Sequence, residues 1–107
     1  MRLNPLHPGL YLVHRSRALF ILGRYEEALA QIERAVVGMP AHANALALLA
    51  ACYASLGRMT DARNAVQRVR VASPDFTLGY IRKTLSYANA ADLDMLCSLL
   101  ETAGLPK

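Results

Sequence analysis

Residues 23–28 read Gly-Arg-Tyr-Glu-Glu-Ala, and residues 57–62 read Gly-Arg-Met-Thr-Asp-Ala. The second copy lies 34 residues after the first, and Pro40 and Pro74 keep the same offset. A fixed period of this length is typical of proteins built from repeated helix–turn–helix units. Because one such unit cannot bury its apolar face alone, neighbouring units must stack. The period therefore predicts an all-α fold of three stacked antiparallel αα-hairpins.

Length and composition agree with this interpretation. The 107 residues have room for one domain and for three units of 34 residues, and 54% of them are hydrophobic. We expect the domain to cover residues 10–107, in units of about 9–42, 43–76 and 77–107. Residues 1–9 contain Pro5 and Pro8, which disfavour a regular helix. We interpret them as a linker or as the tail of a preceding repeat.

Glycines and prolines divide the chain into six predicted helices. Gly23 and Gly57 each follow an apolar periodic segment, and glycine is favoured just after the last residue of a helix. Thr60 or Asp61 is the expected N-cap of the fourth helix. The predicted helices cover residues 10–22, 25–38, 42–56, 60–72, 76–87 and 90–103.

The second helix of each unit carries the clearest packing pattern. Small and branched side chains recur in order before the closing proline: Ala28, Ile32, Ala35 and Pro40 in unit one, and Ala62, Val66, Val69 and Pro74 in unit two. With the turn glycines, this pattern resembles the tetratricopeptide repeat (TPR) family. The resemblance implies a right-handed superhelix that acts as a protein–protein interaction scaffold.

The third unit matches less well. Ala91 stands at the place of the turn glycine, and Leu96 stands at the place of the packing alanine. We therefore expect a degenerate terminal unit, which arrays of this kind usually have.

Three strings support a narrower resemblance. Arg2-Leu-Asn-Pro-Leu-His-Pro8, Leu22-Gly-Arg-Tyr-Glu-Glu-Ala-Leu29 and Leu100-Glu-Thr-Ala-Gly-Leu-Pro106 resemble the C-terminal TPR tails of bacterial adenylate cyclases. This resemblance implies a regulatory region of a larger bacterial signalling protein. The sequence contains no catalytic domain of that family, so no cyclase activity is assigned to it. An independent small TPR adaptor is the alternative.

The charge pattern favours a solvated surface. The formal net charge is +4, and the basic residues are spread along the chain. Arg63, Arg68 and Arg70 form the densest group, on the predicted fourth helix. A nucleic-acid binder usually gathers its basic residues on one face. We therefore interpret this group as a solvated outer face, and a basic helical nucleic-acid binder is the least favoured alternative.

No residue pattern indicates catalysis. His7, His14 and His42 are isolated, and Cys52 and Cys97 lack ligand spacing. We expect no enzymatic activity, no metal and no cofactor. The sequence also lacks a secretion signal and an apolar run long enough to cross a bilayer, so a cytoplasmic setting without membrane association is expected.

The TPR resemblance implies a partner-binding groove lined by the first helix of each hairpin. The matching positions are Leu10, Val13, Arg17, Asn44, Ala47, Ala51, Leu78, Ile81 and Arg82. Most of them are apolar, which favours a protein or peptide with an apolar or amphipathic segment. The alternative is that the rest of a parent protein covers this surface.

Neither end of the array has the polar cap that a terminal unit needs. Met95 and Leu99 have no obvious partner within the chain, and Phe20 and Ile21 would pack on an earlier repeat. Burying such side chains is favourable, so we expect a homodimer with a two-fold symmetric contact.

Overall fold

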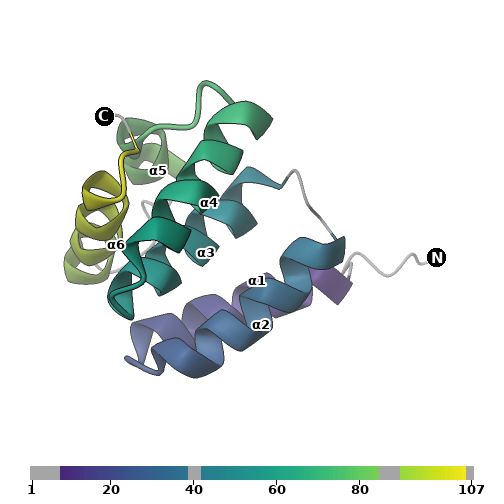
Figure 1. Ribbon diagram of the computed structural model, residues 1–107. Coiled ribbons are helices and arrows are strands. Elements are labelled where there is room, and N and C mark those ends of the chain that lie inside the picture. The colour runs from purple at the N-terminus through teal and green to yellow at the C-terminus, as the bar shows by residue number, and fades with distance from the viewer. Residues whose placement is uncertain (1–7, 39–41, 85–89, 106–107) are drawn as a thin grey trace.

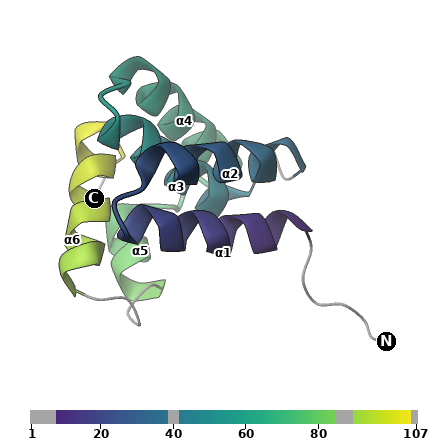
Figure 2. The ribbon, with the colours of Figure 1, turned by 90° about the horizontal axis from the view of Figure 1, so that it is seen from below.

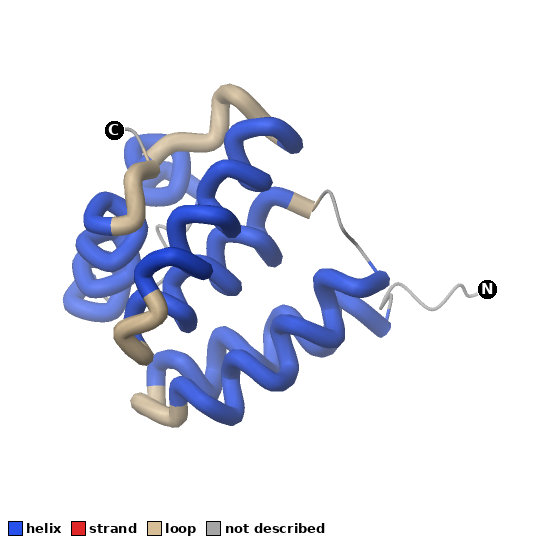
Figure 3. Tube along the Cα trace, in the orientation of Figure 1, coloured by secondary structure: helices blue, strands red, loops and turns tan. Residues whose placement is uncertain are grey.

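The computed structural model describes residues 8–38, 42–84 and 90–105, and the regular elements within these ranges are six helices (Figures 1 and 3). In chain order they are α1 (Pro8–Ile21), α2 (Tyr25–Gly38), α3 (Ala43–Ser55), α4 (Met59–Ala72), α5 (Leu78–Thr84) and α6 (Ala90–Thr102). Neighbouring helices pack as pairs, so the predicted all-α hairpin fold is confirmed.

The first two hairpins turn in the same way, 34 residues apart. Gly23 and Gly57 have φ angles of +81° and +79°, which non-glycine residues rarely adopt. The next backbone N–H reaches back over each turn: Arg24 N donates to Leu19 O and Arg58 N donates to Tyr53 O, both at 2.9 Å. These are the bonds of a Schellman motif, which satisfies the last carbonyls of a helix.

Small side chains let the two helices of each hairpin approach closely. Ala28 and Ala62 are both fully buried, as the repeat register predicts. Ser16 is fully buried as well, and its Oγ donates a hydrogen bond to Ala28 O at 2.7 Å. Ala50 occupies the same place in the second hairpin and is equally buried. A small side chain is thus the shared requirement, and the hydroxyl of Ser16 adds a satisfied polar contact.

Helix α3 lies at the centre of the molecule. It packs against α4 within its own hairpin, against α1 and α2 of the first hairpin, and against α6 (Figures 1 and 2). Eight consecutive residues, 45–52, are buried, so α3 is apolar on nearly all sides. A helix of this kind is stable only when other elements surround it. At its start, His42 accepts a hydrogen bond from Ala45 N through Nδ1 at 3.2 Å.

The third unit does not continue the stack in the pattern of the first two. Helix α5 has seven residues, and α6 packs against α3 as well as against α5. Tyr25, at the start of α2, donates a hydrogen bond through its hydroxyl to Met95 Sδ at 3.7 Å. In Figures 1 and 3, α6 lies beside the turns that join α1 to α2 and α3 to α4.

Several predicted boundaries need correction. Helix α1 begins at Pro8 rather than Leu10, because proline is tolerated in the first turn, where an N–H has no partner. Helix α4 begins after Arg58, without a side-chain cap, and Asp61 instead accepts a hydrogen bond from Arg58 Nε at 2.9 Å. Phe76 precedes α5. The tail was expected over residues 1–9, but Pro8 and Gly9 belong to α1. Its residues 1–7, Pro40 and the end of the fifth helix at residue 87 lie outside the described residues.

Candidate functional site

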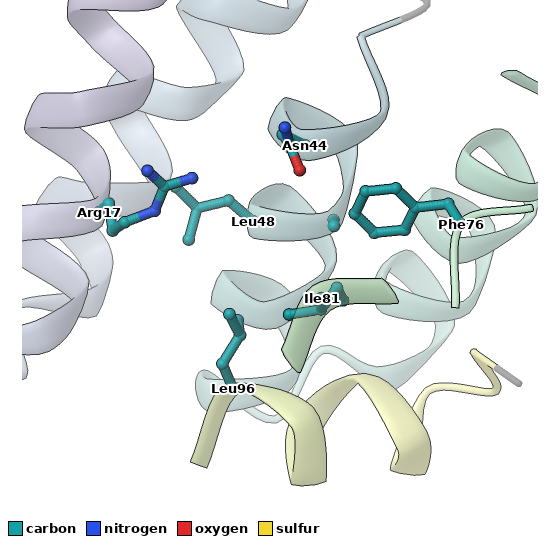
Figure 4. Close-up of a pocket in the computed structure, with 7 residues that line it drawn as sticks. Arg17, Asn44, Leu48, Phe76, Ile81 and Leu96 are labelled. Carbon is teal, nitrogen blue, oxygen red and sulfur yellow. The ribbon is translucent and has the colours of Figure 1, made fainter. Parts of the chain in front are cut away.

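A small hollow opens on the face formed by α1, α3, the start of α5 and α6 (Figure 4). We call it the inner hollow. Arg17 approaches it from α1, and Phe76 lies opposite, just before α5. The residues that line it are Arg17, Asn44, Ala47, Leu48, Phe76, Ile81 and Leu96.

Four of the nine predicted groove residues meet at the inner hollow: Arg17, Asn44, Ala47 and Ile81. The structure thus brings together side chains from all three first helices of the hairpins. Their role in binding a partner stays a prediction.

Three other predicted groove residues lie away from the hollow. Val13, Ala51 and Leu78 are buried, with at most 7% of their surface exposed, and they do not line the hollow. The side chains of Leu10 and Arg82 lie outside the described part of the chain.

Three lining residues were not predicted: Leu48, Phe76 and Leu96. Leu48 follows Ala47 in α3 and is buried, so the hollow extends around the helix beyond the predicted face. Phe76 was predicted to be the first residue of the fifth helix, but it lies before α5. The centre of its ring is 5.2 Å from that of Tyr80 in α5. Leu96 reaches the hollow because α6 folds back onto α3, a contact that no local pattern of the sequence indicates.

The size of the inner hollow limits what it can bind. Its cavity volume is only about 10 Å³. Ligand pockets for cofactors and drug-sized molecules are usually about 300–1,000 Å³. The inner hollow is far smaller than such pockets. Among the described residues, no group of three or more metal-ligating side chains comes together.

A second hollow, the outer hollow, lies between α2, α3 and α4 and was not predicted. Its cavity volume is about 350 Å³. The residues that line it are Glu33, Val36, Val37, Leu49, Tyr53 and Arg68. Tyr53 donates a hydrogen bond through its hydroxyl to Glu33 Oε2 at 3.1 Å, and the Arg58 guanidinium lies 4.7 Å from the centre of the Tyr53 ring. Burial, and secondly the bond to Glu33, raise the pKa of Tyr53. The wide, open form of this hollow differs from that of a closed ligand pocket.

The residues expected to mediate self-association are only partly available. Phe20 is 2% exposed, and its ring lies edge-on to Tyr25 with centroids 5.3 Å apart. The expectation that Phe20 faces an earlier repeat is therefore wrong, because the start of α2 covers it. Met95 and Leu99 are half-buried, and Met95 has a partner in Tyr25. Ile21 remains 45% exposed.

Both cysteines are buried and free. Burial raises the pKa of the Cys52 thiol to about 12; a hydrogen bond with Ser16 opposes this change, and the charge of Glu33 adds to it. The thiol therefore stays protonated at neutral pH, and a protonated, buried thiol is a poor nucleophile.

Comparisons with known proteins agree with the geometry. A family model described as tetratricopeptide repeat matches residues 19–79, more than half of the chain. No curated protein and no solved structure matches the chain. None of the helices in the described ranges has the length and apolar character needed to cross a membrane.

Proposed function

The chain belongs to the tetratricopeptide repeat family, and from this premise we propose that it is a protein–protein interaction module that holds an apolar or amphipathic segment of a partner. One observation carries the proposal: side chains from α1, α3, α5 and α6 converge on the inner hollow. Convergence of several repeats on one depression favours recognition of a chain segment over recognition of a small molecule.

The proposed mode of binding follows from the lining. One apolar side chain of the partner enters between Leu48, Phe76 and Ile81, which removes its surface from water. At the rim, the Asn44 amide offers N–H donors to carbonyl groups of the partner backbone. The Arg17 guanidinium already interacts within the chain, but it has five N–H donors and can add to this binding. An amphipathic helix or a short extended segment satisfies both requirements.

The test is a peptide-display selection against the full chain, followed by affinity measurements on two variants. Asn44→Trp places a large ring at the rim of the inner hollow, and Asn44 is exposed, so the core is not disturbed. Asn64→Trp is the matched control, because Asn64 is an exposed asparagine on α4, away from the hollow. Both variants must keep the wild-type thermal midpoint.

The proposal predicts that selected peptides share an apolar anchor residue. It also predicts that Asn44→Trp weakens their binding at least tenfold, whereas Asn64→Trp changes it less than twofold. Equal binding by wild type and Asn44→Trp would rule out the inner hollow as the site. Selection of peptides without a shared apolar residue would contradict the proposed anchor.

A narrower role is proposed on the three sequence strings alone: the regulatory TPR region of a larger bacterial signalling protein, such as an adenylate cyclase. The alternative remains an independent adaptor of the same fold. The genomic sequence before the Met1 codon distinguishes them. An in-frame effector domain supports the first role, and a stop codon directly upstream supports the second.

A further inference from the structure

One face of α2 serves as the surface on which the next hairpin stacks. Leu29, Glu33 and Val36 recur at spacings of four and three residues, so they share a face of the helix. Glu33 accepts the hydrogen bond from Tyr53 of α3, and Val36 lines the outer hollow together with Tyr53. Leu29 and Val36 are each 6% exposed. This face therefore meets α3.

The corresponding face of α4 is open and charged. Adding 34 to each number gives Arg63, Gln67 and Arg70, and all three are exposed. Among the described helices, α4 packs extensively only against α3. Within the described ranges, the structure shows no ion pair for Arg63 or Arg70. We call these three residues the basic stripe. Arg63 and Arg70 of α4 replace the two apolar residues of α2 on which the next hairpin stacks. This face of α4 is therefore exposed to solvent.

Helix α6 carries a set of opposite charge with the same spacing. Asp94, Ser98 and Glu101 are exposed at positions i, i+4 and i+7, and we call them the acidic stripe. In each stripe the two charged residues lie about 10.5 Å apart along the helix axis. Asp94 and Glu101 each interact within their own chain. A carboxylate can nevertheless accept about four hydrogen bonds, so it can also receive an arginine from another molecule.

We propose that the basic stripe of α4 binds the acidic stripe of α6 in a second copy of this chain. Under two-fold symmetry both contacts form together, because α4 of each copy then meets α6 of the other. Val71, which is 83% exposed beside the basic stripe, adds apolar area. The dimer is independent of the inner hollow and goes beyond the proposed function.

Charge also disfavours the obvious competing assembly, head-to-tail stacking. The exposed face of α1 contains Tyr11, Arg15 and Ile21. Leu49, which matches Arg15 in α3, lines the outer hollow together with residues of α2. Stacking this face of α1 on α4 of another copy would bring Arg15 close to Arg63 and Arg70. Like charges at such an interface oppose association. The acidic stripe is the complementary surface.

The experiment is sedimentation equilibrium of the full chain, with a reductant, in low and high salt. We expect a monomer–dimer equilibrium in the micromolar range that weakens at least tenfold between 50 and about 500 mM NaCl, because exposed ion pairs are screened. Arg63→Glu with Arg70→Glu should give a folded monomer, and so should Asp94→Arg with Glu101→Arg. An equimolar mixture of the two variants should form a heterodimer, because both contacts become complementary again.

The matched control is Arg15→Glu with Arg34→Glu, which changes the net charge by the same amount at exposed residues outside both stripes. It should dimerise like the wild type. A wild-type chain that stays monomeric at 100 µM in low salt would overturn the proposal. A dimer that survives reversal of the basic stripe would also overturn it, and so would two folded variants that do not associate when mixed.

Discussion

The side chains at positions 28 and 62 determine how closely the helices of each hairpin approach. Both alanines are fully buried, and the carbonyl of Ala28 accepts the hydrogen bond of Ser16 from the facing helix. A larger side chain at either position must push two helices apart or adopt an unfavourable rotamer.

Ala62→Leu should therefore lower the free energy of unfolding by about 1–3 kcal/mol. Ala18→Leu makes the same change on the exposed face of α1 and should have almost no effect. Chemical denaturation of both variants is the measurement. If the two variants were equally stable, Ala62 would not lie at a tight helix–helix contact.

The Cys52 thiol makes the stability of the folded chain depend on pH in the alkaline range. The pKa of this thiol is about 12 in the folded chain, against an ordinary value of 9.0, mainly because burial disfavours the thiolate. Above pH 9 the unfolded chain loses this proton first, so the stability that Cys52 contributes is complete below pH 9 and is lost as the pH rises toward 12.

Between pH 8 and 10.5, wild type should lose about 2 kcal/mol more of its unfolding free energy than Cys52→Ala does. Each chain is compared with itself by urea denaturation at the two pH values, so the lower baseline stability of the variant cancels. Equal losses in both chains would show that other groups account for the alkaline dependence.

At the scale of the elements, the hairpin turns depend on their glycines. Gly57 has a φ of +79°, and a methyl group added there would meet no atom within 4 Å, so backbone conformation alone should determine the cost of replacement. Gly57→Ala should destabilise the chain by about 1–2 kcal/mol. Gly38→Ala, at the exposed end of α2, should instead stabilise it by about 0.5–1 kcal/mol. Thermal unfolding of the two variants tests this opposite sign.

Helix α6 is predicted to be an integral part of the core. Leu100 is fully buried, whereas Leu22 is 69% exposed. Leu100→Ala should cost about 2–5 kcal/mol through lost burial and the remaining cavity. Leu22→Ala should cost less than about 0.5 kcal/mol, as surface substitutions usually do. Similar stabilities for the two variants would mean that α6 is detached from α3 in solution.

Local signals predicted the first two units well. The bounds of α2, residues 25–38, agree with the prediction because Gly23 precedes a strongly periodic segment and Gly38 ends it. The arrangement of the third unit was harder to predict, because it depends on which residues α4 has at the positions where α2 receives the next hairpin. Arg63 and Arg70 occupy the places of Leu29 and Val36, so α4 offers the next hairpin a charged surface, and α6 packs on α3 instead.

The residues of the candidate site were likewise predictable only in part. Arg17, Asn44, Ala47 and Ile81 could be predicted, because the repeat register places them on the first helices of the hairpins. Leu96 and the burial of Phe20 could not, because each depends on a contact between segments whose relative placement the sequence pattern does not specify.

At the scale of the whole molecule, α6 changes the form of the inner face. A regular third hairpin would extend the stack, but here α6 lies beside the turns of the first two hairpins and closes one side of the inner hollow (Figures 1 and 4). The proposed partner segment would therefore insert one anchor side chain into a short site bounded by α6.

The most direct test of this account is an NMR titration of the isotope-labelled chain with a peptide from the selection described above. The account predicts that the largest amide shifts occur at Arg17, at Asn44 to Leu48, at Phe76 to Ile81 and at Leu96, with little change on α2 and α4. Shifts concentrated instead at Glu33, Val37 and Arg68 would place the partner in the outer hollow and contradict the account.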